Sequence, residues 1–284
     1  MGSDPIKWRE NVEVNRYLAE IAQADPAARR AALEAALAAE GFTPEIQEVV
    51  ADATHRAARN YLIRSGSAGA CPLFCAHYDA HPGSEGANDN AAGVCITLAL
   101  AAALRAQGVA AEFAFFDGEE SGHSGAKLFL EEQAREYSCI VNLDMCGYGD
   151  TIAVYARGSE KREGARAFCL KERLAAHGAE LVRYLPEGDD VCFTTRRQPV
   201  LSIAIMPKWD TKYLTAMAAQ GSGLLGRTPE FQMMIGEMEV ASTMHGGYRD
   251  ALQYVQPQAM QQVFEYLLDC ATHPAPAKKR FGFF

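Results

Sequence analysis

The stretch EFAFFDGEE, residues 112–120, decides the fold of this 284-residue chain. Its first part, 112–116, is almost wholly apolar, which is typical of a strand that is buried on both faces. Residues 91–107 before it form an apolar run that ends at Gly108, as a buried helix does. A helix followed by a buried strand indicates an α/β protein, and the acidic residues 117–120 come directly after the strand.

The same alternation continues on both sides of this stretch. Further strands are predicted at 61–64, 72–76, 139–143, 152–155 and 200–205. Further helices are predicted at 27–40, 124–137, 160–177 and 256–271. Strands separated by helices of this length favour a largely parallel sheet with right-handed crossovers.

Acidic and imidazole side chains stand directly after three of the predicted strands. These residues are His77 and Asp79, then Glu119 and Glu120, then Asp144. The carboxyl ends of parallel strands lie along one edge of a sheet, which is where α/β proteins bind ligands. Imidazoles and carboxylates are ligands that zinc takes, so the sequence predicts a metal site at this edge.

Two further ligand candidates lie in glycine-rich segments, Asp89 in GANDNAAG and His245 in STMHGGY. The inventory suffices for two zinc ions: His77 and Asp144 on one, Glu120 and His245 on the other, and Asp89 shared between them. Two Zn²⁺ and three carboxylates leave one positive charge, which one bridging hydroxide would neutralise. A carboxylate-rich site of this kind can also take Co²⁺ or Mn²⁺.

Glu119 and Asp79 are predicted to act beside the metals. Glu119 adjoins a ligand without being one, so it is the candidate general base that moves a proton from water to a leaving amine. Asp79 is placed to accept the other ring N–H of His77. His81 and His123 lie near these motifs with no ligand role left, so we expect surface or supporting residues there.

These segments resemble the five blocks of the di-zinc aminopeptidases, the family of the bacterial leucyl aminopeptidases. The blocks are HYD at 77–79, GANDNAAG at 86–93, FFDGEESG at 115–122, NLDM at 142–145 and the closing His245. The resemblance implies a single α/β zinc-peptidase domain over 1–284, with a mixed, mostly parallel central sheet sandwiched between helices and a helical segment, 1–43, packed on it. It also implies two Zn²⁺ ions and hydrolysis of the peptide bond that follows a free N-terminal residue, with Glu119 as general base.

The resemblance extends to candidate substrate contacts. GDDVCF at 188–193 takes the place of a block near the substrate pocket, so Asp190 is expected to bind the substrate ammonium. Some relatives carry a tyrosine just before the last histidine, thought to steady the oxyanion, where this chain has Met244. Tyr248 is the nearest phenol that could take that role. The segment 209–244 carries no motif and is expected to form core or an apolar pocket wall.

Other functions on this scaffold remain as alternatives. Glutaminyl cyclases, acyltransferases that work with a single zinc, share the HYD block but line their pocket with tryptophans, whereas this chain has only Trp8 and Trp209. Carboxypeptidases and deacylases with similar metal blocks usually insert a dimerisation domain before the last ligand, and the predicted elements between Asp144 and His245 leave little room for one. A catalytically dead binding module would lack a ligand or the base, and none is missing.

The composition narrows the expected partners and location. The net charge of −9 disfavours nucleic acid. No apolar run approaches the length of a membrane span, so no membrane partner is expected. The eight cysteines show no C-x-x-C spacing and no apolar signal segment is seen, so we expect reduced thiols and a cytoplasmic protein. The expected partner is a peptide or a small aminoacyl substrate, and homo-oligomerisation is left open.

Overall fold

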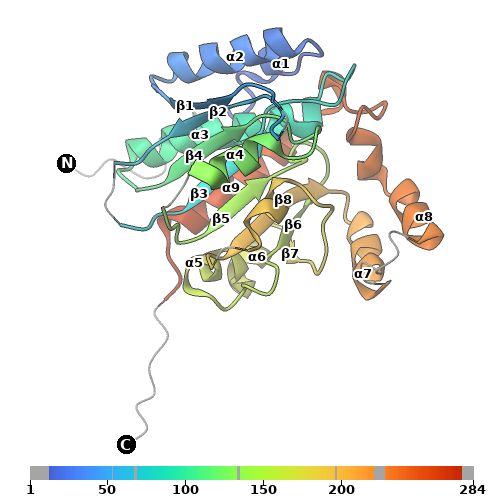
Figure 1. Ribbon diagram of the computed structural model, residues 1–284. Coiled ribbons are helices and arrows are strands. Elements are labelled where there is room, and N and C mark those ends of the chain that lie inside the picture. Colours follow the sequence, from blue (N-terminus) through green and yellow to red (C-terminus); the bar gives the residue numbers. More distant parts are fainter. Residues whose placement is uncertain are drawn as a thin grey trace, which may run out of the picture.

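The computed structural model describes residues 13–276 except 53, 67–68, 133–134, 196 and 221–227. Its centre is an eight-stranded sheet in the order β1-β2-β4-β3-β5-β8-β6-β7 (Figure 1). The strands are β1 (Glu45–Val49), β2 (Ala58–Ile63), β3 (Leu73–His77), β4 (Glu112–Phe116), β5 (Ile140–Leu143), β6 (Thr151–Tyr155), β7 (Ala179–Leu181) and β8 (Val200–Met206). Strands β4, β3, β5 and β8 run parallel, whereas β1–β2, β2–β4 and β6–β8 pair antiparallel. The mixed, mostly parallel sheet is therefore confirmed.

The three central strands bring their carboxyl ends to one edge. In the register of β3, His77 lies beside Phe116 of β4, and Cys75 lies beside Asn142 of β5. Every residue of these three strands is buried, because helices cover both faces of the sheet. The side chains that follow the three strands therefore meet at a common point.

The α-helices form layers on the two faces of the sheet (Figure 1). They are α1 (Leu18–Ile21), α2 (Pro26–Ala39), α3 (Ala92–Ala106), α4 (Ser124–Glu132), α5 (Glu163–Arg166), α6 (Lys171–Ala176), α7 (Asp210–Gln220), α8 (Pro229–Glu237) and α9 (Pro257–Thr272). Helices α3 and α9 pack together within the largest apolar core, and α4 packs Phe129 against Phe116 and Phe193 in a second core. In the described part of the chain, one helical stretch, Ala87–Ala106, is long and apolar enough to span a membrane, but 89% of its 18-residue apolar window is buried inside the protein, as in a core helix.

Helix α2 forms as its sequence predicts. The side chain of Asp25 caps it by accepting a hydrogen bond from the backbone N–H of Ala28 at 2.8 Å, and Pro26 occupies the first turn. Its apolar residues Leu33 and Leu37 join the core that contains α3. Helix α2 thus packs on the core, and the first twelve residues of the predicted segment 1–43 lie outside the described part of the chain.

The described parts of the segment 209–244, which leave out 221–227, contribute to both the core and the wall of a pocket. Helices α7 and α8 and the 3₁₀ turn η5 (Glu239–Thr243) lie beyond β8 at the side of the sheet (Figure 1). Within their own apolar cluster Met217 is 1% exposed, whereas Met233 on α8 is 69% exposed. Met217 therefore belongs to the core, whereas Met233 faces solvent.

The structure departs from the sequence predictions at the periphery. Strands β1 and β7 were not predicted, and β1, with the sequence EIQEV, buries one of its five residues. Such a polar edge strand lacks the apolar pattern by which strands are recognised. The helix predicted at 160–177 is broken into α5, the 3₁₀ turn η3 (Ala167–Cys169) and α6, because Leu170 adopts an extended conformation. All eight cysteines have free thiols, six of them buried.

Candidate active site

His77 is the centre of the site and is 1% exposed at the end of β3. Its Nε2 lies 3.3 Å from Oδ1 of Asp89 and 3.5 Å from Oδ1 of Asp144. Its Nδ1 lies 3.3 Å from Oδ1 of Asp79 on the opposite side of the ring. The imidazole thus faces two predicted ligands with one nitrogen and the predicted orienting carboxylate with the other, as the sequence predicts.

Asp89 lies in the irregular turn η2 (Ala87–Ala91), which leads into α3 and contains a cis peptide bond between Asp89 and Asn90. Its Oδ2 accepts a hydrogen bond from the backbone N–H of His245 at 2.9 Å. The two oxygens of this carboxylate therefore face His77 on one side and the His245 segment on the other. The role of Asp89 as a ligand shared between two ions stays a prediction.

Asp250 holds the Asp89 loop in place, and no sequence motif marked it. Its Oδ1 accepts hydrogen bonds from the backbone N–H groups of Asn88 at 3.0 Å and Asp89 at 3.1 Å. Its Oδ2 accepts a hydrogen bond from the Ser84 hydroxyl at 2.6 Å. Because Asp250 is 2% exposed, these bonds are shielded from water and fix the loop that carries Asp89.

Asn88 links the same loop to two other segments. Its Nδ2 donates to the Thr243 hydroxyl at 2.7 Å, and its Oδ1 accepts from the backbone N–H of Gly147 at 2.6 Å. The loop after β5 and the segment before His245 are therefore tied to one side chain.

His81 is exposed, and its ring centroid lies 6.5 Å from that of His245, in keeping with a surface role.

Asp79 joins the His77 segment to the loop that carries the two glutamates. Its carboxylate accepts hydrogen bonds from the backbone N–H groups of Glu119 at 3.0 Å and Glu120 at 3.2 Å. One carboxylate thus orients the imidazole and sets the position of the candidate base and the neighbouring ligand. The sequence predicted the first of these roles and missed the second.

The donor atoms at this edge fit a metal site. One donor atom each from His77, Asp89 and Asp144 lies within 4.8 Å of the other two. The ring nitrogens of His77 and Oδ1 of Asp144 are buried and make only the ion-pair contacts given above, without hydrogen-bond geometry, and Oε1 of Glu120 is buried without a hydrogen-bond partner. Buried polar atoms are ordinarily paired, so a convergence of unpaired metal-ligating atoms indicates a place for a divalent cation. Among the described residues, three of the five predicted ligands converge on one centre in this way. Glu120 and His245 are not part of that group.

The charges of the site also favour a cation. Burial raises the pKa of Glu119 to about 9, and the carboxylates of Asp144 and Asp189 act in the same direction. Burial and the carboxylate of Asp89 raise the pKa of Glu120 to about 7. Burial lowers the pKa of His77, but Asp144, Asp79 and Asp89 outweigh it and raise that pKa well above its usual value. Negative charge is therefore in excess here, and a bound cation would offset it.

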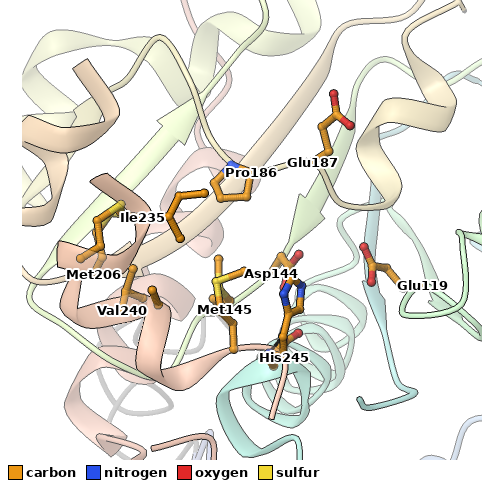
Figure 2. A pocket seen from close by; sticks show the side chains of 13 residues that line it. Glu119, Asp144, Met145, Pro186, Glu187, Met206, Ile235, Val240 and His245 are labelled. Atoms are coloured by element: carbon orange, nitrogen blue, oxygen red, sulfur yellow. Dashed lines mark hydrogen bonds between the residues drawn. The ribbon is translucent and has the colours of Figure 1, made fainter. Parts of the chain in front are cut away.

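A pocket opens beside these ligands and has one charged and one apolar wall (Figure 2). Asp144, His245 and Glu119 all line this pocket (Figure 2). The residues of the apolar wall are Met145, Pro186, Met206, Ile235, Met238, Val240, Ala241 and Met244. An extended ligand could therefore place a polar group at the acids and an apolar group at the methionines.

Asp190 and Tyr248 are not placed for the contacts predicted for them. Asp190 is fully buried, and its carboxylate accepts from Nε of Arg157 at 2.6 Å and from the backbone N–H of Gly188 at 3.2 Å. The guanidinium thus takes the place that a substrate ammonium would need. Tyr248 is 70% exposed, packs on Tyr254, and does not line the pocket.

Arg29 of helix α2 is a second residue that sequence reasoning missed. It is 1% exposed, and its guanidinium donates to the backbone carbonyls of Tyr78, Glu85 at 2.6 Å and Gly86 at 2.9 Å. Gly86 has a φ of 56°, and a Cβ there would lie 2.5 Å from Cβ of Ala80 and 2.8 Å from the carbonyl oxygen of Asp89, so glycine is required at this position. The available signal was the position of Arg29 four and eight residues before Leu33 and Leu37, which places it on the apolar face of the helix. An arginine buried on such a face needs hydrogen-bond partners.

Solved structures share this fold at low sequence identity. LapA aminopeptidase of Legionella pneumophila is 13% identical, with a TM-score of 0.65 over 95% of this chain and 73% of that one. A glutaminyl cyclase of an Acidobacteriales bacterium is 17% identical, with a TM-score of 0.64 over 96% of both chains. A leucine aminopeptidase precursor of Bacteroides thetaiotaomicron VPI-5482 is 15% identical, with a TM-score of 0.63 over 94% of this chain and 97% of that one. A search of curated proteins gave no match.

The sequence itself matches one family model. The model of peptidase family M28 covers residues 63–270, which include all five predicted metal ligands and the candidate base. The matched segment also contains the sheet edge at which these side chains converge. Because the match extends over well more than half of its length, the chain belongs to peptidase family M28.

Proposed function

We propose that this protein is an aminopeptidase that uses two divalent metal ions, with zinc as the first candidate, to remove N-terminal residues from peptides. The observation that carries the proposal is the convergence of His77, Asp89 and Asp144 on one centre beside a pocket with an apolar wall. Membership of a peptidase family supports hydrolysis of a peptide bond. The aminopeptidases among the structural neighbours support the same overall scaffold.

The residues of the chain take distinct parts in this reaction. His77, Asp89 and Asp144 would hold one cation, and Glu120 and His245 would complete the site for a second that shares Asp89. When bound, such cations polarise a peptide carbonyl and make water more acidic. Glu119 accepts a proton from the attacking water at its carboxylate and passes it to the departing amine. Asp79 keeps Glu119 and Glu120 in place through their backbone N–H groups.

The two walls of the pocket suit the two ends of an N-terminal residue. Its scissile carbonyl would lie at the charged wall, and its side chain would lie against the methionines of the opposite wall. Methionine side chains are flexible and adapt to apolar groups of different shapes. The pocket therefore favours apolar N-terminal side chains over charged ones.

The proposal is tested on purified protein by hydrolysis of a panel of aminoacyl arylamides, with metal analysis on the same sample. We expect two metal ions per chain, loss of activity with a chelator, and recovery when Zn²⁺ is returned. Glu119→Gln should lower kcat by about 10²- to 10⁴-fold while the metal content stays unchanged. A fully active sample with one metal ion per chain would contradict the two-metal proposal.

Glutaminyl cyclase is the second candidate, favoured by the structural neighbour that covers 96% of this chain. Against it, the position just before His245, where the resemblance to glutaminyl cyclases implies a pocket tryptophan, holds Met244. Trp209 is 52% exposed and does not line the pocket. A peptide that begins with glutamine separates the two functions. Release of free glutamine supports the aminopeptidase, whereas rapid formation of a pyroglutamyl peptide without hydrolysis would establish the cyclase.

A further inference from the structure

His123 lies between two carboxylates in the turn that carries Glu119. Its Nδ1 is 3.4 Å from Oε1 of Glu119 and 3.2 Å from Oδ1 of Asp189. Ionised carboxylates can only accept hydrogen bonds, so the ring N–H that serves them is the one on Nδ1. Among the residues that the structure describes, no other imidazole or cationic side chain comes within ion-pair distance of Glu119.

The carboxylate of Asp189 has a hydrogen bond with the imidazole of His123. It is fully buried at the start of the 3₁₀ turn η4 (Asp189–Phe193). Its Oδ1 faces His123, and its Oδ2 is buried without a hydrogen-bond partner. Burial raises the pKa of Asp189, and His123 opposes that shift. A buried carboxylate with one partner is costly to the fold, so packing does not explain its presence beside the site.

The backbone fixes the point from which the imidazole extends. His123 has a φ of 61°, in the left-handed region that glycine and asparagine adopt most readily. The carbonyl of Glu119 accepts hydrogen bonds from the backbone N–H groups of Gly122 at 2.9 Å and His123 at 3.1 Å. The candidate base and the histidine therefore belong to one closed turn, and His123 has little freedom to move relative to Glu119.

We propose that His123, anchored by Asp189, is a positioning residue that holds the carboxylate of Glu119 in its reactive orientation. The proposal rests on the proposed function, because it assigns His123 a task in the reaction that Glu119 serves. Without the imidazole, the Glu119 carboxylate loses the ring nitrogen that lies within ion-pair distance of it and faces the buried charge of Asp189. The base then samples orientations that do not reach the attacking water.

The test compares three variants at position 123. His123→Gly removes the imidazole and accepts the backbone conformation. His123→Asn also accepts it, and its amide nitrogen is bonded to Cγ as Nδ1 is, so it restores a donor near the same place. His123→Asp suits the backbone but offers no donor when ionised. Each variant is measured for melting temperature, bound metal, kcat and KM, and is crystallised with metal bound.

We expect His123→Gly and His123→Asp to lower kcat by about 10- to 100-fold, since displacement of a catalytic group by ~1 Å has effects of this size. KM and metal content should stay close to those of the unmodified protein, and His123→Asn should recover most of kcat. In the crystals, the Glu119 carboxylate should be displaced in the Gly and Asp variants and in place in the Asn variant. An unchanged kcat in His123→Gly, or no recovery in His123→Asn, would overturn the proposal.

The crystallographic comparison separates this proposal from the proposed function. If the unmodified protein releases no N-terminal residue from any substrate, the aminopeptidase proposal fails. The position of Glu119 in the metal-loaded variants still decides whether His123 holds it. An identical Glu119 conformation in all three variants would dismiss the positioning role whatever the reaction is.

Discussion

The two walls of the pocket are built in different ways. The charged wall is held by directional hydrogen bonds, in which backbone N–H groups of the Asp89 loop donate to Asp250 and that of Glu119 donates to Asp79. The apolar wall, with Met206 and Met238, belongs to a separate cluster held by side-chain packing. Directional bonds set atom positions, whereas methionines repack around what they contact. Chemistry and substrate preference should therefore respond separately to mutation.

Loss of the shared ligand should have the largest effect. Asp89→Asn keeps the size of the side chain but removes a charge that faces both His77 and the backbone of His245. We expect the bound metal to fall and kcat/KM to drop by more than ~100-fold, because even partners outside the ligand shell contribute 10- to 100-fold. Metal analysis and arylamide hydrolysis measure both. Full metal content with normal activity would show that Asp89 is not a ligand.

Removal of the support beneath that ligand should have the next largest effect. Asp250→Ala leaves the buried N–H groups of Asn88 and Asp89 and the Ser84 hydroxyl without their acceptor. We expect metal affinity to fall by about 10- to 100-fold, measured by competition with a chelator. Asp250→Asn, which keeps one acceptor oxygen, is the matched control and should fall between the two. Equal affinity in all three proteins would show that the loop is fixed by other contacts.

The contribution of helix α2 can be isolated at two neighbouring arginines. Arg29→Met removes the guanidinium donor from the carbonyls of Tyr78, Glu85 and Gly86, of which only that of Gly86 keeps a backbone donor, the N–H of Ala91, among the hydrogen bonds described, and it should lower the free energy of unfolding by about 3 kcal/mol. Arg30→Met, at an exposed position of the same helix, should change it by less than ~0.5 kcal/mol. Urea unfolding of the metal-free proteins measures both. Similar values for the two variants would mean that Arg29 does not clamp the loop.

The apolar wall should give the smallest change, and one of a different kind. Met244→Leu replaces a flexible side chain at the pocket with a branched one of similar volume. We expect the ratio of kcat/KM for N-terminal methionine and valine substrates to shift by about 2- to 10-fold, with metal content unchanged. A uniform loss of kcat for every substrate would instead indicate that this wall takes part in the chemistry.

The sequence was most informative where chemistry and topology coincide. His77 ends β3 and Asp144 directly follows β5, both strands buried on both faces, so their meeting at one edge follows from the parallel order. Strand β1 escaped prediction because it is polar and lies at the edge of the sheet. The predicted helix at 160–177 is interrupted at Leu170, where tertiary packing overrides the local periodicity.

Contacts between distant segments could not be read from the sequence. Asp250 reaches a loop 161 positions away, and Asp190 bonds Arg157 instead of facing the pocket. Acidic residues have the same local signature whether they meet a substrate, a guanidinium or a backbone N–H. Their partners are therefore decided by the completed fold.

The guanidinium of Arg29 has one further consequence. It reaches the carbonyls of Tyr78, Glu85 and Gly86 from a helix that lies outside residues 63–270, the part that the family model covers. A fragment trimmed to those residues would keep every predicted ligand. It would lose the hydrogen bonds that Arg29 donates to the loop between His77 and Asp89. The smallest self-sufficient unit of this peptidase is therefore longer than the segment that holds its chemistry.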